Sequence, residues 1–442
     1  MRDRFRHVWE RTDRLFATIA PDALLDRPIV LRHPFVFYLG HLPAFAWNHV
    51  CRYVHDRPAF EPHLDAIFDR GIDPDVDASA HGRTADDATP AWPAVDRVLA
   101  YRDRIREELL ACIADVDASE ATDGTSAARR ALIMALEHEQ MHQETLLYMI
   151  QQLDPRRRVR SGAAPIYRRG DALRARPIEI PAGGATLGSG FDALDFGWDN
   201  EFPHARVDVP AFVIDSTPVT NGEYLQFIEA GAYDAPELWL EEDRAWIRRH
   251  GLRHPALWAR SNGDWRYRTV ADELPLAAAR DWPVYVSLAE ARAYARWRRG
   301  RLPTEAEFHR AAYGDPAGDE RAFPWGDEEP HAQHGNFHFA YLSPVPVGSH
   351  PAGASAWGVH ELVGNGWEWT QSVFGPFPGF HTTMPSYPGY SADFFDGKHY
   401  VLKGASWATD LQLLRRSFRN WYQARYPYVF AKFRCVRTEE RA

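Results

Sequence analysis

The 442-residue sequence contains only three cysteines, Cys51, Cys112 and Cys435, and no two of them form a CxxC pair. A framework of disulfides needs more cysteines than this, and a cysteine-ligated metal site needs them at short spacing. Both are therefore excluded as the organising feature of the protein. If a metal is bound, histidines must hold it.

The sequence also lacks an apolar run of about 18 residues, the length that a membrane-spanning helix requires. Its N-terminus has no apolar signal-peptide core. The net charge of -10 is dispersed, and the single Arg-rich stretch, Arg156 to Arg176, is interpreted as a solvated linker. We therefore expect a cytoplasmic protein, with neither a membrane nor a nucleic acid as partner.

The chain divides into two parts that differ in the pattern of their apolar residues. A chain of this length is expected to form more than one domain. Residues 1–153 carry apolar side chains at helical spacing and predict a four-helix bundle. Residues 154–177 are rich in Arg, Pro and Gly and are predicted to be a linker. Residues 178–442 show short apolar runs broken by Gly, Pro, Asp and Trp, which predicts a domain of mixed α and β structure. The predicted bundle helices are Arg4–Ile19, Pro34–Tyr53, Ala94–Val116 and Ala127–Leu153.

A candidate metal site lies in the last predicted bundle helix, within EHEQMHQETLLYMI. His138 and His142 are four residues apart and share one helix face, so both imidazoles can reach one ion. A third histidine, His41, lies in another long apolar helix, and inward-facing residues of different bundle helices can meet. Three histidines would leave open positions for substrate and oxygen, as in non-haem iron sites, although the commoner iron triad includes a carboxylate.

The same segment also matches the HExxH motif of zinc hydrolases, in which Glu139 would activate a zinc-bound water. The motif is short, and no downstream HxxE or GxxH element supplies the third ligand that such enzymes need. A non-catalytic binding module built from the same two parts is a further alternative. It predicts that the three histidines do not converge.

The second half contains several specific motifs in a fixed order, and together they resemble the formylglycine-generating enzymes, a variant of the C-type lectin fold. Those enzymes use a cysteine pair shortly before the last motif, whereas this chain has no cysteine in that region and Cys435 lies alone within the motif itself, so that activity is disfavoured. The motifs are TPVTNGEYLQFI, RLPTEAEFHRAA, FPWGD, GVHELVGNGWEWT, LKGASW and FAKFRCVR.

Taken over nearly its whole length, the chain resembles the ergothioneine and ovothiol sulfoxide synthases. The resemblance implies an α+β multidomain protein, with a DinB-like four-helix bundle followed by a formylglycine-generating-enzyme-like, C-type-lectin-like domain. It also implies a mononuclear iron(II) held at the positions of His41, His138 and His142. In this family oxygen is a co-substrate, and a chalcogen donor is joined to an imidazole carbon of a histidine derivative. That C–H bond is inert, so iron and oxygen must supply the oxidising power.

The motif FRNW, Phe418 to Trp421, resembles the one with which ergothioneine-type enzymes hold hercynine, the trimethylated histidine. A quaternary ammonium has no N–H to donate, so an aromatic face and oriented dipoles must recognise it. Trp421 and the side-chain carbonyl of Asn420 suit these roles. The loop FPGFHTTMPSYPGYSADFFDG resembles the family loop that bears a catalytic tyrosine and a companion, which correspond to Tyr387 and Tyr390.

The sequence departs from the ergothioneine-type pattern at two positions, and both bear on the identity of the chalcogen donor. Enzymes that use γ-glutamylcysteine typically follow FRNW with Asp, but here the residue is Tyr422, which suits a donor without an ammonium group. Met141 stands where such enzymes often have Gln, which changes the polar contacts available to the substrate imidazole. With the opening of the second helix, RHPFVFYLGHLPAFAWN, these features favour a selenoneine synthase using hercynine and a selenosugar. An ergothioneine-type enzyme using cysteine or γ-glutamylcysteine is the alternative.

Lectin-like modules of this kind often carry a structural calcium. Asn336, Asn365 and Glu368 are possible ligands for it.

Overall fold

The computed structural model describes residues 1–69, 92–120, 127–159 and 167–437. The chain separates into two compact units, which are described one at a time. The first comprises Met1–Ala163 together with the short segment Met384–Pro388, and the second comprises Ala164–Thr383 and Gly389–Ala442. Among the described residues, no helix is both long enough and apolar enough to cross a membrane.

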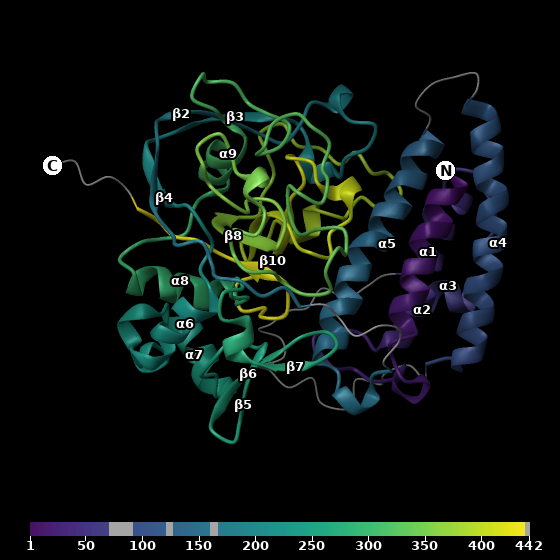
Figure 1. Cartoon of the computed structure of the whole chain (residues 1–442). Helices are drawn as coiled ribbons and strands as arrows, with labels where there is room; N and C mark the ends of the chain where they lie inside the picture. Colours follow the sequence, from purple (N-terminus) through teal and green to yellow (C-terminus); the bar gives the residue numbers. More distant parts are fainter. Residues whose placement is uncertain (70–91, 121–126, 160–166, 438–442) are drawn as a thin grey trace. The chain divides into compact units, whose positions relative to one another are not determined.

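The first unit is a bundle of α-helices, as predicted (Figure 1). Helix α1 packs on α5, and α2 packs on both α4 and α5. The short helix α3 packs against α2. The helices are α1 (Arg2–Phe16), α2 (Phe35–Ala46), α3 (Pro62–Phe68), α4 (Val95–Glu120) and α5 (Ala127–Gln152).

Helix α2 occupies the centre of this bundle, because every one of its twelve residues is buried. Its sequence FVFYLGHLPAFA is apolar on all faces, which is typical of a helix enclosed by other elements. The helix continues into a π-helical turn, Trp47–Arg52, shortly after the internal Pro43. Gly40 lets the ring of Phe68 pack directly on the helix, since a Cβ at Gly40 would lie 2.5 Å from that ring.

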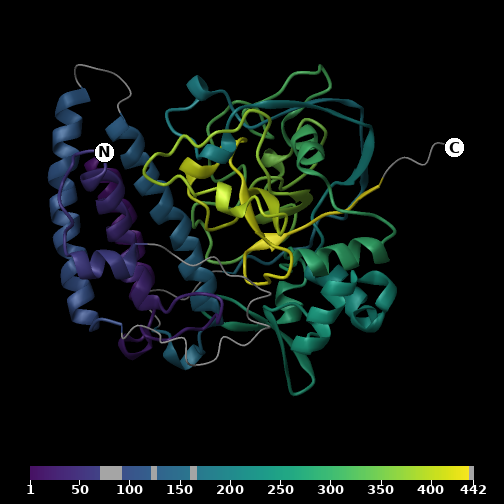
Figure 2. The ribbon, with the colours of Figure 1, turned by 180° about the vertical axis from the view of Figure 1, so that it is seen from behind.

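The second unit is built around a mixed four-stranded sheet, with strand order β10-β9-β8-β11. Strands of this unit, drawn in teal, green and yellow, lie among long irregular stretches of chain (Figure 2). Three smaller sheets have the orders β1-β4-β12, β2-β3 and β5-β6-β7. The strands of the central sheet are β8 (Gly366–Val373), β9 (His399–Ala405), β10 (Asn420–Gln423) and β11 (Ala431–Lys432). The remaining strands are β1 (Pro177–Ile180), β2 (Gly183–Leu187), β3 (Ala205–Val209), β4 (Phe212–Asp215), β5 (Trp258–Ser261), β6 (Asp264–Arg268), β7 (Glu273–Pro275) and β12 (Val436–Arg437).

Short helices accompany these sheets: α6 (Asn221–Glu229), α7 (Glu241–His250), α8 (Leu288–Trp297) and α9 (Glu305–Tyr313). Three of them, α6, α8 and α9, begin with a capping box, in which a Ser or Thr and the Glu three residues later satisfy backbone N–H groups of the first turn. Helix α7 has no such box. It ends at Gly251 in the left-handed conformation.

Buried ion pairs hold the irregular parts of the second unit in place. The carboxylate of Glu368 on β8 accepts hydrogen bonds from both Nε and Nη2 of Arg434, and Lys432 Nζ lies 3.5 Å from it. All three side chains are fully buried. Glu201 is likewise buried and receives a two-point contact from Arg415, at 2.8 and 2.6 Å. These pairs tie segments far apart in sequence, because Glu201 and Arg415 are separated by more than 200 residues.

Both ends of the predicted linker, residues 154–177, pack on the unit that they adjoin. On the N-terminal side, Arg157 pairs with Asp26 and Asp22 of the first unit. On the C-terminal side, Tyr167 donates a hydrogen bond to Asp272, and the Arg176 N–H donates one to Ser216. The middle of the segment, residues 160–166, lies outside the described residues.

We expect Gly404→Ala to destabilise the second unit strongly. Gly404 has φ +83°, and a Cβ there would lie 2.2 Å from the carbonyl oxygen of Leu362. The left-handed backbone alone costs about 1–2 kcal/mol for alanine, and the clash should bring the loss to about 3 kcal/mol or more. Gly397→Ala is the matched control, since its φ is +77° but a Cβ there meets nothing within 4 Å. Equal losses in urea unfolding would contradict this account.

The Glu201–Arg415 pair should make stability depend on acid pH. Burial alone would raise the pKa of Glu201, but Arg415 and Ser417 hold that pKa below its usual value. A lowered folded-state pKa stabilises the protein above the unfolded value of 4.5, and this stabilisation is lost as the pH falls below it. Glu201→Gln should therefore cost about 3 kcal/mol at pH 7. The difference from wild type should shrink in unfolding measurements below pH 4, whereas a difference independent of pH would contradict the assignment.

Candidate metal centre

Three histidines of the first unit converge, two from α5 and one from α2. His41, His138 and His142 each offer a ring nitrogen, and these nitrogens all lie within 4.8 Å of one another. The ring centroids are 5.0 Å apart for His41 and His138, 5.2 Å for His41 and His142, and 4.5 Å for His138 and His142. The packing of α2 on α5 therefore brings together the three residues that the sequence singled out.

Packing and hydrogen bonding fix the orientation of the rings. The Nδ1 of His41 lies 2.8 Å from the carbonyl oxygen of Phe68. A carbonyl can only accept, so His41 Nδ1 carries the proton and its Nε2 lone pair is free to bind a metal. The His41 ring stacks on Phe37 at 4.8 Å, and the His138 ring stacks on Phe45 at 3.5 Å.

Burial keeps these imidazoles neutral. It lowers the pKa of His41 to about 4, despite the opposing effect of the Phe68 carbonyl. Burial, and after it the neighbouring histidines, lower the pKa values of His138 and His142 well below the usual value. Neutral imidazole is the form that coordinates a metal, so no proton has to be displaced at neutral pH.

Two buried nitrogens in the cluster, Nδ1 of His138 and Nδ1 of His142, have no hydrogen-bonding partner among the residues that the structure describes. Leaving buried polar atoms unpaired costs free energy, and such atoms in a native structure call for an explanation. Three neutral imidazoles, two of them with an unsatisfied nitrogen, suit a borderline divalent ion such as iron(II) or zinc. The residues present therefore fit a mononuclear metal held by three histidines.

The third polar residue of HExxH does not belong to this cluster. Glu139 is buried, and its carboxylate accepts a 2.6 Å hydrogen bond from Thr12 on α1. Arg106 on α4 lies 3.9 Å from the same oxygen and also pairs with Asp13 of α1. Glu139 thus stabilises the packing of α1 on α5, and its engagement there argues against a zinc hydrolase in which it would activate a metal-bound water.

A fourth histidine, His49, lies next to this cluster and was not singled out from the sequence. It lies on the π-helical turn after α2, with its ring 4.1 Å from Phe45, and burial lowers its pKa to about 4. The segment Met384–Pro388 of the first unit places Tyr387 5.4 Å from the His49 ring and 5.6 Å from the Phe45 ring. The spacing of His41, Phe45 and His49 by four residues was the available signal.

Met141 precedes His142 on α5 and is half-buried. Its backbone carbonyl lies 3.5 Å from the Thr145 hydroxyl. The thioether offers only a weak acceptor, so this position gives a substrate fewer hydrogen bonds than a glutamine would.

In the second unit, aromatic rings surround Trp421 on β10. Its indole stacks on Phe374 at 4.3 Å and 7°, and Tyr390 meets it edge-on at 5.3 Å. Phe394 lies 5.6 Å away. Tyr390 in turn stacks on Trp198 at 4.0 Å. The structure therefore groups two of the predicted residues, Tyr390 and Trp421, in one aromatic cluster.

The other predicted residues of this region lie on the same strand. Asn420 precedes Trp421, and its Oδ1 accepts a 2.9 Å hydrogen bond from the Trp421 N–H. Tyr422 is half-buried and stacks on Tyr426 at 5.2 Å and 6°, which presents a flat polar surface rather than a charge. Strand β10 pairs with β9, which places Tyr422 opposite Tyr400.

Among the residues proposed for calcium, the oxygens of Glu368 and Asn365 are engaged by protein donors, and Asn336 Oδ1 alone has no donor among the described residues. Glu368 is held by Arg434 and Lys432. Asn365 Oδ1 accepts hydrogen bonds from Asn336 Nδ2 and from the Val345 N–H. A calcium ion needs six to eight free oxygens, so the geometry gives no support to calcium at these residues.

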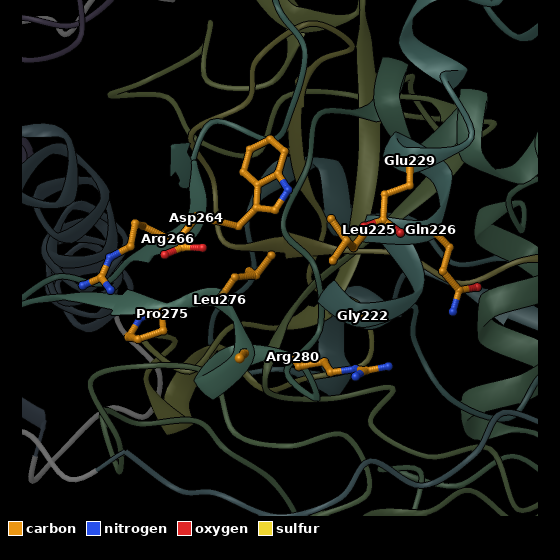
Figure 3. Close-up of a pocket in the computed structure, with 11 residues that line it drawn as sticks. Gly222, Leu225, Gln226, Glu229, Asp264, Arg266, Pro275, Leu276 and Arg280 are labelled. Carbon is orange, nitrogen blue, oxygen red and sulfur yellow. The ribbon is translucent and has the colours of Figure 1, made fainter. Parts of the chain in front are cut away.

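A cavity of about 600 Å³ opens beside the small β5-β6-β7 sheet of the second unit (Figure 3). Side chains of both charges line it, among them Glu229, Asp264, Arg266 and Arg280, together with the apolar Leu225 and Leu276. None of the residues predicted to act in a site is among those that line it. It is therefore distinct from the residue groups described above.

Comparison with known families matches both parts of the chain. Residues 169–439 match the Sulfatase-modifying factor enzyme 1-like domain, and residues 4–146 match the DinB superfamily. The predicted order of a DinB-like helical region followed by a formylglycine-generating-enzyme-like domain is thereby confirmed.

Comparison with curated proteins finds relatives over most of the chain. A "Hercynine oxygenase" of Mycobacterium tuberculosis is 37% identical, and the matched region covers 85% of this chain and 85% of that protein. That of Mycolicibacterium thermoresistibile is 40% identical over 68% of this chain and 67% of its own. "Ergothioneine biosynthesis protein 1" of Neurospora crassa is 32% identical over 98% of this chain, which spans 57% of that longer protein.

Replacing His138 by Ala should remove one equivalent of tightly bound divalent metal, because the remaining two imidazoles leave an incomplete ligand set. The measurement is the stoichiometry of iron(II) bound under anaerobic conditions after removal of free metal. His63→Ala is the control, since that histidine is exposed on α3 and should bind as wild type does. Unchanged stoichiometry in His138→Ala, with the fold intact by circular dichroism, would show that the histidine cluster is not a metal site.

Proposed function

Because the chain belongs to the family of DinB and sulfatase-modifying-factor-like proteins that includes the hercynine oxygenases, we propose that it is an oxygen-dependent hercynine chalcogenoxide synthase. In this reaction the imidazole C2–H of hercynine, a donor R–SeH or R–SH, and O2 give the C2-linked selenoxide or sulfoxide and one water. The observation that carries the proposal is the convergence of His41, His138 and His142. Iron(II) bound there would activate oxygen and supply the oxidising power.

The aromatic cluster around Trp421 supports hercynine as the substrate. A trimethylammonium group is attracted to the face of an aromatic ring and gains most from tryptophan. Trp421 is half-buried, with one face supported by Phe374 and with Tyr390 alongside. We assign recognition of the quaternary ammonium to Trp421 and Asn420.

Tyr387 is proposed as the proton donor of the reaction. Its phenol belongs to the first unit together with the three histidines, and it lies beside His49 and Phe45. A phenolic O–H can transfer a proton at the moment of bond formation, which favours joining donor and imidazole over simple oxidation of the donor. Tyr390 is its companion and supports Trp421 by an edge-on contact.

The donor is proposed to be a selenosugar. Tyr422 places a neutral, flat side chain where a carboxylate would bind the ammonium of an amino-acid donor. Its stacking on Tyr426 keeps that surface rigid. The second candidate is an ergothioneine-type enzyme that takes cysteine or γ-glutamylcysteine, and the relatives named for ergothioneine biosynthesis favour it.

A competition assay tests the reaction and the donor together. Iron(II)-loaded protein in air receives hercynine with equal concentrations of a selenosugar, γ-glutamylcysteine and cysteine, and products are read by mass spectrometry. The selenium adduct of hercynine should dominate. A dominant sulfur adduct would move the protein to the ergothioneine branch, and no adduct from any donor would refute the proposed reaction.

Tyr422→Asp should shift the donor preference toward γ-glutamylcysteine. A new ion pair with an ammonium group is worth about 1.5–3 kcal/mol, or roughly a tenfold or greater change in the ratio of kcat/KM values. Tyr422→Phe, which adds no charge, should keep the wild-type preference and is the control. The same preference in both variants would mean that this position does not contact the donor.

Tyr387→Phe should lower the yield of the hercynine adduct while oxygen consumption continues, because the proton donor is lost but the metal ligands remain. The diverted product should be the oxidised donor. Tyr53→Phe, at an exposed tyrosine of the same unit, should leave the partition unchanged. Parallel loss of oxygen consumption and adduct in Tyr387→Phe would instead point to a role in assembling the site.

A further inference from the structure

A second group of metal-binding side chains lies in the other unit, on the loop that follows the FPWGD motif. Glu328, His331 and His334 each offer a ligand atom, and these atoms all lie within 4.8 Å of one another. The three residues are spaced by three along the chain, and none belongs to the groups assigned to hercynine or its donor. This group, which we call the loop triad, is independent of the histidine cluster of the first unit.

Aromatic packing fixes one member of the loop triad. His334 is 5% exposed, and its ring stacks on Trp325 at 4.4 Å and 11°. Trp325 stacks on Phe323 at 5.0 Å, and its Nε1–H donates a 2.9 Å hydrogen bond to the carbonyl oxygen of Glu328. The stack therefore positions a ligand ring and the backbone of a ligand carboxylate at the same time. Such pre-ordering lowers the entropy lost when an ion binds.

The three ligand atoms lie close to one another. Glu328 Oε1 lies 3.2 Å from His331 Nε2, and Glu328 Oε2 lies 3.7 Å from His334 Nε2. The two imidazole rings are 3.8 Å apart. The backbone N–H groups of Gln333 and His331 approach the Nδ1 atoms of His331 and His334 at 3.3 and 3.4 Å. These are long contacts that can be given up when each ring proton moves to Nδ1 and Nε2 binds an ion.

Charge and access also suit a cation. Asp327 and Glu329 flank Glu328, so three acidic residues in succession surround the site with negative potential. Burial, with His331 next, lowers the pKa of His334, so that its ring is neutral at pH 7. The side chains of His331 and Glu328 are 43% and 70% exposed, which leaves the site open to ions from solution.

We propose that the loop triad binds a zinc ion, or a divalent ion of similar preference, through two imidazole nitrogens and one carboxylate oxygen. Zinc accepts this mixed nitrogen and oxygen set and takes a fourth ligand from water. The bound ion joins the exposed His331 and Glu328 to the fixed His334. It therefore stabilises the loop from Phe323 to His334 in the second unit.

The test uses the full-length protein, stripped with a chelator and titrated with zinc while the bound metal is counted. The background is His138→Ala, which removes the histidine cluster of the first unit as a competing site. This variant should still bind one equivalent of zinc and unfold at a higher temperature when zinc is added. Adding His331→Ala to the same background should abolish both effects, and His331 is exposed enough to be replaced without disturbing the fold.

Glu329→Gln in the His138→Ala background is the matched control, because it removes an adjacent exposed acid that is not a ligand. It should retain the bound equivalent, whereas Glu328→Gln should weaken it at least tenfold. The proposal is overturned if His138→Ala binds no zinc, or if its equivalent survives in the His138→Ala, His331→Ala double variant. Neither result depends on hercynine turnover. The zinc site can therefore be refuted while the proposed function is retained, and the proposed function can be refuted while the zinc site is retained.

Discussion

The close packing of α2 in the centre of the helical unit is the constraint on which the candidate metal centre depends. Every residue of α2 is buried, so His41 cannot reach solvent. Gly40 removes the side chain that would keep Phe68 away from the helix. The Phe68 carbonyl then lies at hydrogen-bonding distance from His41 Nδ1 and sets the tautomer. One tightly packed contact thus fixes both the position and the chemical form of a ligand.

The cost of this arrangement is the burial of polar groups. Three imidazoles lie in an apolar interior, and two of their nitrogens have no partner in the described part of the chain. A helix packed this way would be more stable with apolar residues at these positions. Retaining the histidines is understandable if an ion satisfies them. Nearby Glu139 shows the contrasting case, because its buried carboxylate is satisfied by Thr12 and supports helix packing instead.

The second unit differs from the first, because long irregular segments surround a small sheet and must be held in place by side-chain contacts. The ion pair of the buried Glu201 with Arg415 connects two described segments that no strand pairing joins. On this support, β10 presents Asn420, Trp421 and Tyr422 in succession. Aromatic rings rather than charges surround Trp421, which is what recognition of a quaternary ammonium requires. The loop triad differs from both regions, because two of its three ligands are exposed and it can exchange ions with solvent.

The sequence by itself determined the class of the fold and the residue types of the candidate metal centre. Helical periodicity, the HExxH spacing and the ordered motifs of the second half are local signals, which tertiary context does not erase. Only the tertiary structure decided which side chains meet. Glu139 lies between His138 and His142 in sequence, yet it points to α1, because successive helix positions are turned by about 100°. The sequence offered Glu368 as a calcium ligand, but in the folded chain Arg434, 66 residues away in sequence, donates a hydrogen bond to its carboxylate. The stacking of Trp325 on His334 likewise depends on the tertiary structure, because their separation in the chain has no helical or strand periodicity.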